Sequence, residues 1–131
     1  MSLLNNWWPC IHIHCFTETH KEAFKWLIVS NNLYVGPTGY ATHTSSTPTA
    51  PEPSRRTLAF PSRFLLETDS PMNKPIDDCA STCGVTHECL CHPGHALNVA
   101  CKIAVERRVS ICDVLQTVTA NFQGLYRIEI A

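Results

Sequence analysis

Two acidic side chains, Glu67 and Asp69, stand at the end of the apolar run in FLLETDSP, residues 64–71. Two imidazoles, His12 and His14, alternate with isoleucine in an earlier segment, CIHIHCF. Side chains alternate along a β-strand, so each pair shares one face if its segment is a strand. An imidazole and a carboxylate at neighbouring strand ends can chelate a divalent metal ion, and the carboxylate can accept a proton from a metal-bound water. The pattern therefore favours His14 and Asp69 as metal ligands, with Asp69 also as a catalytic group.

Each of these residues also has a structural alternative. Asp69 can cap the turn that follows it, and His14 can be a hydrogen-bonded histidine of the core. Glu67 lies one pleat deeper than Asp69, where it can orient a ligand without touching the ion or be a buried, hydrogen-bonded acid. His12 is more typical of a core position. Cys15 and His14 are adjacent, and neighbours in a strand point to opposite faces, which disfavours a Cys–His nucleophile.

A second group of candidate ligands occupies the segment CASTCGVTHECLCHPGH, residues 79–95. Its cysteines are Cys79, Cys83, Cys89 and Cys91, and three histidines lie among them. Soft and borderline ligands at this density can build a tetrahedral zinc site. The spacing is not that of a standard zinc finger, so a loop with reduced, structurally ordinary thiols is the alternative.

Hydrophobic periodicity predicts the elements that would position these side chains. The predicted order is a strand at 10–16, a helix at 17–32, a strand at 33–36, a strand at 63–69, and helices at 94–108 and 110–125. Segments 37–56 and 70–93 are rich in loop-forming residues. Strand, helix and strand with short connections indicate a parallel sheet and an α/β fold. Functional groups of such sheets gather at the C-terminal ends of the strands, where His14 and Asp69 are expected.

The expected core faces of these helices follow the same periodicity. Between 17 and 32 the apolar face consists of Ala23, Phe24, Leu27 and Ile28. Between 94 and 108 it consists of Ala96, Val99, Ala100 and Ile103. Between 110 and 125 it consists of Ile111, Val114, Leu115, Val118 and Phe122, after a capping box formed by Ser110 and Asp113.

Composition limits the class of protein. The chain has 131 residues, of which 44% are hydrophobic and 16% charged, as in a globular domain. Its formal net charge of −1 provides no general attraction to nucleic acid, so such binding needs a local site or a metal ion. No apolar run approaches the roughly 20 residues of a membrane span. Eight cysteines and no export signal predict reduced thiols in the cytoplasm or nucleus.

Several stretches together resemble one family. HCFTE, LYVGPTG, RFLLETDSP, HPGH and TANFQGLYRI occur in the order seen in the C-terminal part of TatD-like metal-dependent deoxyribonucleases. The resemblance implies about three parallel strands, with flanking helices, of a TIM-type (β/α)8 barrel. It implies hydrolysis of phosphodiester bonds in DNA with a divalent ion such as Mg²⁺, Mn²⁺ or Zn²⁺. Asp69 then corresponds to the metal-binding Asp that follows the last barrel strand, and His14 to a metal-binding His that follows an earlier strand.

The chain departs from the family in what it lacks. The family's H-x-H after the first strand, its Glu after a middle strand and another His have no counterpart in this sequence. Three strands also fall short of the eight in a closed barrel. We therefore expect residues 1–131 to form a single partial domain, truncated and inactive alone unless self-association or a second chain completes the barrel. A zinc-binding interaction module at 79–95 and a non-catalytic half-barrel are the alternatives.

Overall fold

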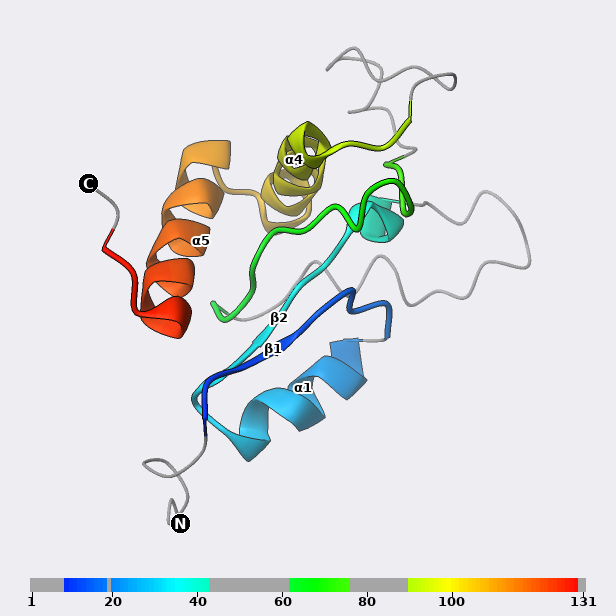
Figure 1. Ribbon diagram of the computed structural model, residues 1–131. Coiled ribbons are helices and arrows are strands. Elements are labelled where there is room, and N and C mark those ends of the chain that lie inside the picture. Colours follow the sequence, from blue (N-terminus) through cyan, green and yellow to red (C-terminus); the bar gives the residue numbers. More distant parts are fainter. Residues whose placement is uncertain (1–8, 19, 43–61, 76–89, 130–131) are drawn as a thin grey trace.

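A computed structural model describes residues 9–18, 20–42, 62–75 and 90–129 of the chain (Figure 1). The elements follow one another in the order β1 (Ile11–Ile13), α1 (His20–Val29), β2 (Leu33–Val35), the 3-10 helix η1 (Gly39–Thr42), the 3-10 helix η2 (Pro93–His95), α4 (Ala96–Arg107) and α5 (Ile111–Tyr126). The predicted α/β class is confirmed. Among the described residues, no helix is long and apolar enough to cross a membrane.

The sheet has two parallel strands and the beginning of a third. β1 and β2 pair in parallel, with Ile11 opposite Leu33. Phe64 adds one isolated parallel bridge to Val35, and Leu65 N–H donates to the Val35 carbonyl at 2.9 Å. The prediction of a continuous strand over 63–69 is therefore wrong in its length.

Two further features shape this third segment. On the side away from β2, the carbonyls of Ser62 and Phe64 accept hydrogen bonds from Asn121 Nδ2 of α5, at 2.5 and 2.8 Å. A helix side chain thus pairs with this edge where another strand would otherwise pair. Farther along, Asp69 has a φ of 52°, and its carbonyl accepts a hydrogen bond from Met72 N–H at 2.8 Å. This turn takes the backbone out of the extended conformation.

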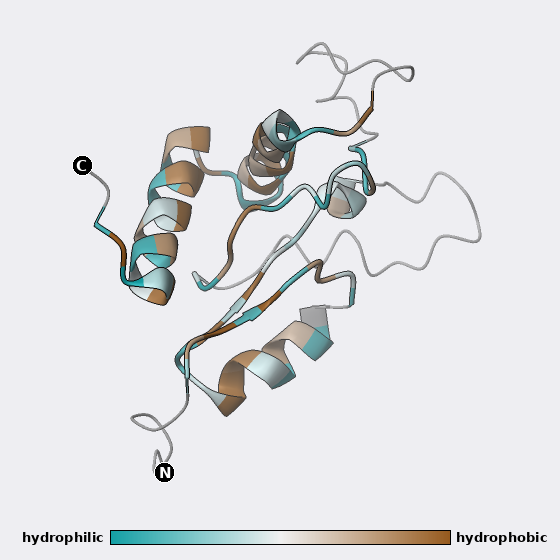
Figure 2. Cartoon of the chain, in the orientation of Figure 1, coloured by the Kyte–Doolittle hydropathy of each residue, from teal (hydrophilic) through white to brown (hydrophobic). Residues whose placement is uncertain are grey.

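Helix α1 lies along the sheet and buries only a narrow stripe. Ala23 and Leu27 are buried in the core, at 0% and 2% exposure. Phe24 and Ile28, in contrast, are 54% and 69% exposed, so their predicted place in the core face is wrong. Among the described elements α1 packs mainly on β2. Packing against one strand covers a narrower stripe of the helix than its full set of apolar residues. In Figure 2, hydrophobic positions, coloured brown, recur along α1.

The C-terminal end of α1 is held by the segment that carries the acids. The guanidinium of Arg63 donates hydrogen bonds to the carbonyls of Leu27 and Ser30. Carbonyls at a helix C-terminus have no partner within the helix, so this arginine satisfies them. It also fixes the beginning of the 63–69 segment relative to α1, before the segment reaches the acids.

Helices α4 and α5 pack against one another on the other side of the 62–75 segment (Figure 1). Val99, Ala100 and Ile103 of α4 are buried as predicted, and so is Val114 of α5. Phe122 is 37% exposed and so is not fully part of the predicted stripe. Its ring instead packs against the ring of the last residue of α5, Tyr126, with centroids 4.8 Å apart.

The predicted capping box at the start of α5 is confirmed. Ser110 Oγ accepts a hydrogen bond from Asp113 N–H at 3.1 Å, and Asp113 Oδ2 accepts one from Ser110 N–H at 3.1 Å. The hydrogen bonds from Ser110 hold the pKa of the Asp113 carboxyl group below its ordinary value. The helix therefore begins where the sequence pattern placed it.

Candidate functional site

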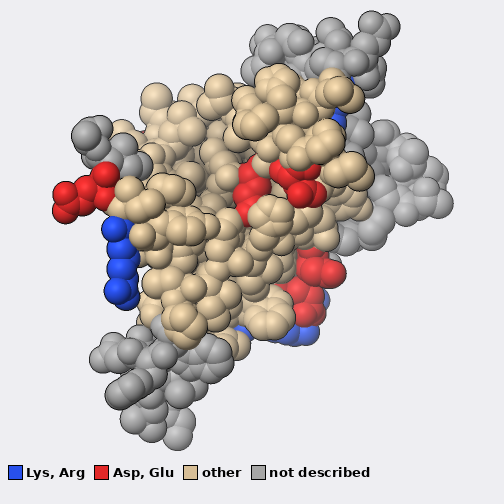
Figure 3. Space-filling view, viewed as in Figure 1, with Lys and Arg blue, Asp and Glu red and all other residues tan. Residues whose placement is uncertain are grey.

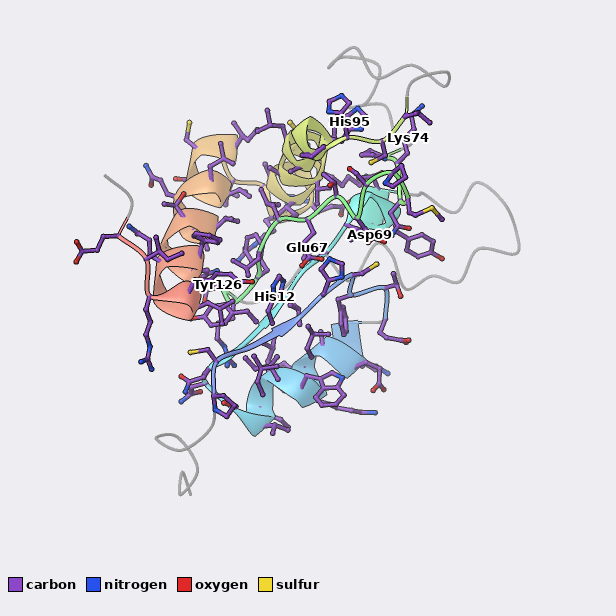
Figure 4. All side chains as sticks on the ribbon, in the orientation of Figure 1. His12, Glu67, Asp69, Lys74, His95 and Tyr126 are labelled. Carbon is purple, nitrogen blue, oxygen red and sulfur yellow. The ribbon has the colours of Figure 1, made fainter. Side chains whose placement is uncertain are left out.

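The candidate site lies where the C-terminal ends of β1, β2 and the third segment meet. Figure 4 labels Glu67 and Asp69 there, with His12 on β1. In the same orientation, Figure 3 shows acidic groups at the centre of this face. The sequence placed these acids at the ends of parallel strands, and the structure agrees.

A β-bulge shapes the end of β1. If the parallel ladder continued, the N–H of Cys15 would donate to the Gly36 carbonyl. Instead Phe16 N–H donates to that carbonyl at 2.9 Å, while Gly36 N–H donates to the Ile13 carbonyl at 2.9 Å. One extra residue has been inserted, which is the definition of a bulge. The Cys15 N–H is thereby released from the sheet, and it donates to Glu67 Oε2 at 2.7 Å.

Glu67 connects all three strand ends. Besides the Cys15 N–H, its carboxylate lies 2.6 Å from His12 Nε2 and 3.6 Å from His14 Nε2, and its side chain is only 8% exposed. On the β2 side it packs so closely on Gly36 that a Cβ atom there would overlap the carboxyl group. Of the two interpretations of Glu67, the buried acid with polar partners describes its contacts directly. Glu67 can also orient His14, because it accepts a hydrogen bond from the N–H of the next residue, Cys15.

His12 connects Glu67 to the C-terminal helix. Its Nδ1 lies 2.9 Å from the hydroxyl of Tyr126, and its Nε2 faces Glu67 Oε1. Those last two atoms are buried and close, yet neither makes a hydrogen bond of acceptable geometry in the described part of the chain. Their contact is a close polar approach between an imidazole and a carboxyl group. The expectation that His12 is an interior residue agrees with its contacts.

Asp69 sits in a turn that directs its carboxylate toward β1. Asn73 Nδ2 donates to Asp69 Oδ2 at 2.7 Å, and Cys15 Sγ lies 3.4 Å from the same oxygen. His14, by contrast, is exposed over 63% of its side chain. Cys15 and His14 both reach the acids, so the strict alternation expected for this strand end is broken by the bulge.

The surroundings of Cys15 favour its thiol form over the thiolate. Burial raises the pKa of the Cys15 thiol above its ordinary value, and the Asp69 carboxylate that accepts its hydrogen bond raises this pKa further. A nucleophilic cysteine needs the opposite shift, because the thiolate is the reactive form. This shift disfavours Cys15 as a nucleophile, for a reason other than the strand alternation on which the sequence prediction rested.

The residues present fit a divalent ion only in part. His14 and Asp69 have suitable donor atoms, and both lie at the same end of the sheet. However, within the described ranges no three His, Cys, Asp or Glu residues are placed to hold a metal ion together. A complete metal site therefore does not exist in this part of the chain, and the roles of His14 and Asp69 as ligands remain predictions.

The alternative zinc cluster lies mostly outside the described residues, which exclude Cys79, Cys83 and Cys89. Cys91 is buried, and its Sγ lies 3.6 Å from Ser70 Oγ and 3.9 Å from the Thr68 carbonyl oxygen. His92 and His95 each accept a backbone hydrogen bond at Nδ1. The described members of the cluster thus have structural partners within the fold.

Two residues of the site were missed in the sequence. Asn73 follows Asp69 by four positions inside a predicted loop, and an amide after a Pro-containing turn is too common to single out. Tyr126 is 114 positions from His12, and no local pattern connects residues so far apart. The contact exists because α5 brings its last turn back beside β1.

Comparison with protein families gives one match that spans nearly the whole chain. The family model described as TatD related DNase matches residues 2–127. This chain belongs to the TatD-related DNase family. The resemblance inferred from HCFTE and RFLLETDSP is thereby confirmed. A comparison with curated proteins finds no match.

Solved structures of TatD-related proteins share the fold. The TatD homologue YJJV from Escherichia coli K12 superposes with a TM-score of 0.69 and 21% identity, covering 91% of this chain and 41% of its own. An uncharacterised amidohydrolase from Saccharomyces cerevisiae superposes with a TM-score of 0.65 and 18% identity, covering 87% of this chain and 39% of its own. A TatD-family hydrolase from Entamoeba histolytica superposes with a TM-score of 0.61 and 15% identity, covering 87% of this chain and 41% of its own.

These likenesses establish the fold and its extent. The chain spans about two fifths of the length of these solved structures and matches part of the TIM-barrel fold of the family, as predicted. The matching family model is described as a DNase, and one of the solved neighbours is described as an amidohydrolase.

Proposed function

We propose that this TatD-related chain supplies part of the active site of a metal-dependent hydrolase that cleaves phosphodiester bonds in DNA. The observation that carries the proposal is the meeting of His14, Glu67 and Asp69 at the C-terminal ends of parallel segments. Active sites of barrels of this type lie at that end of the strands. Family membership supplies the reaction type, and the local geometry supplies the residues.

The chain's own residues would divide the work as follows. Asp69 would be a metal ligand and the proton acceptor, and His14 a second ligand for Mg²⁺, Mn²⁺ or Zn²⁺. Glu67 would stay behind them and fix the distance between their two segments, because it holds the backbone after His14 and belongs to the same segment as Asp69. Groups of this kind orient metal ligands without touching the ion.

Two protein ligands are too few for a catalytic ion, which usually has three or more. We propose that the remaining ligands come from a second copy of the chain or from a second chain. We therefore expect the isolated monomer to cleave no DNA. We also expect any activity to appear only in an assembled form.

A nuclease assay on separated species tests this proposal. The purified chain would be divided by gel filtration into monomer and larger species, and each would be incubated with end-labelled DNA and Mg²⁺, Mn²⁺ or Zn²⁺. Cleavage should be absent from the monomer and confined to an assembled fraction. The Asp69→Asn variant should lower that cleavage at least 100-fold, since it removes the proposed proton acceptor and a ligand.

Asp113→Asn is the matched control, because it makes the same chemical change at an exposed helix start and should leave cleavage unchanged. Equal cleavage by Asp69→Asn and the wild type would contradict the assigned role of Asp69. Absence of cleavage from every fraction would show that this chain does not form a working nuclease by itself in any assembly.

A further inference from the structure

Three residues with left-handed backbone conformations converge beside the site. Cys15, Asp69 and Asn73 have φ values of 50°, 52° and 53°. Asn and Asp tolerate this region, but for cysteine it is uncommon and costs free energy. Such conformations persist where the surrounding structure enforces them, and they gather at functional sites. Here all three bring their side chains to one point.

The side chains form a closed triangle of contacts. Asn73 Nδ2 lies 2.7 Å from Asp69 Oδ2 and 3.2 Å from Cys15 Sγ, and Cys15 Sγ lies 3.4 Å from Asp69 Oδ2. The amide has two N–H groups, so it can donate to both partners. The Cys15 thiol donates in turn to the carboxylate. Within the described segments, both of the donors to Asp69 reach Oδ2 and none reaches Oδ1.

We propose that Asn73 and Cys15 are positioning residues for Asp69, which hold the carboxylate by Oδ2 and leave Oδ1 as the oxygen available to a ligand. The inference deepens the proposed function. It rests on that function only for the role of Oδ1 as the oxygen that binds the metal ion. A carboxylate with one oxygen held by two donors loses rotational freedom, so its other oxygen has a defined direction before any ligand arrives.

The inference is tested first on the metal-free chain by NMR. In the wild type, one side-chain amide proton of Asn73 should resonate downfield of free asparagine and exchange slowly with solvent. Asp69→Ala should return this signal to the position of an unbonded amide. Cys15→Ala should shift it partly, and Cys15→Ser should restore it in part because a hydroxyl keeps a donor and an acceptor there. Cys112→Ala is the control, since Cys112 is an exposed cysteine on α5.

An Asn73 amide signal that does not respond to Asp69→Ala would overturn the inference. So would a Cys15→Ala spectrum that matches the wild type at Asn73 and Asp69. Far-ultraviolet circular dichroism on each variant would distinguish a local change from loss of the fold. Should Asp69→Ala not fold, the isosteric Asp69→Asn variant serves, because loss of the negative charge should also weaken the downfield shift.

A second measurement examines the positioning role through ion affinity. Mn²⁺ binding should weaken about tenfold or more in Asn73→Ala, the usual effect of removing a group that orients a ligand. Cys15→Ala should weaken it less, Cys15→Ser less again, and Cys112→Ala not at all. Unchanged affinity in Asn73→Ala and Cys15→Ala would refute the positioning role and leave the proposed function intact. If the wild type itself binds no Mn²⁺, the metal role fails instead, and the Asn73 signal of the metal-free chain decides the inference.

Discussion

Replacing Glu67 with alanine is expected to lower the free energy of unfolding by about 3 kcal/mol, because a buried charged acceptor and its packing are lost together. The Cys15 N–H, which the bulge has removed from the sheet, would lose its partner. His12 Nε2 would lose the carboxylate that lies 2.6 Å away. Urea unfolding followed by circular dichroism measures the change.

Glu67→Gln is the matched control for this prediction. The amide keeps the shape of the side chain and one oxygen that can accept from Cys15 N–H, so a cost of about 1 kcal/mol is expected. Equal stability of Glu67→Ala and the wild type would show that the carboxylate does not hold the strand ends together. A cost for Glu67→Gln as large as for Glu67→Ala would show instead that the negative charge matters more than the hydrogen bond.

Replacing Gly36 with alanine is expected to cost about 2 kcal/mol, within the range for adding a methyl group to a packed site. The new Cβ atom would overlap the carboxyl group of Glu67. A carboxyl group at the end of a flexible side chain can often move aside. In this site, moving the carboxyl group would break its contacts with His12 and Cys15. The substitution at Gly36 would therefore also destabilise the end of β1.

A double-mutant cycle isolates this effect. In the Glu67→Ala background the atoms that Gly36→Ala would overlap are gone, so the second substitution should cost less than half of its value in the wild type. Residues in contact show such coupling, whereas distant residues give additive changes. Additive changes in the free energy of unfolding would mean that Gly36 is required for another reason.

The fold could be predicted from sequence where a local pattern decides the structure. The capping box at Ser110 and Asp113 and the buried stripe of α4 depend on neighbours within a few positions, and both are present. The outward faces of α1 could not be predicted, because burial of Phe24 and Ile28 depends on which elements lie beside the helix. The outer edge of the third segment likewise pairs with Asn121, which is distant in the sequence.

The candidate site divides in the same way. Alternation along strands located Glu67 and Asp69 near His14, since parallel strands end at one edge of a sheet. The bulge at Cys15 breaks that alternation, and no residue pattern around it announces an inserted residue. Regular alternation would place the Cys15 side chain on the face opposite His14. The bulge places it beside Asp69 instead, where its thiol donates a hydrogen bond.

The apolar surface of α1 bears on the size of the functional unit. Phe24, Trp26 and Ile28 are each at least half exposed. The chain also spans only about two fifths of the solved TatD-related structures it matches. Under the proposed function, further protein would complete the site.

Mn²⁺ titration of the ¹⁵N-labelled chain, with paramagnetic broadening read residue by residue, tests the central claim most directly. We predict selective broadening around His14 and Asp69 at low ion concentration, weakened by His14→Ala and lost in Asp69→Asn, with no change in Asp113→Asn. Broadening that avoids both residues, or that persists unchanged in Asp69→Asn, would contradict the claim that His14 and Asp69 are the metal ligands of this chain.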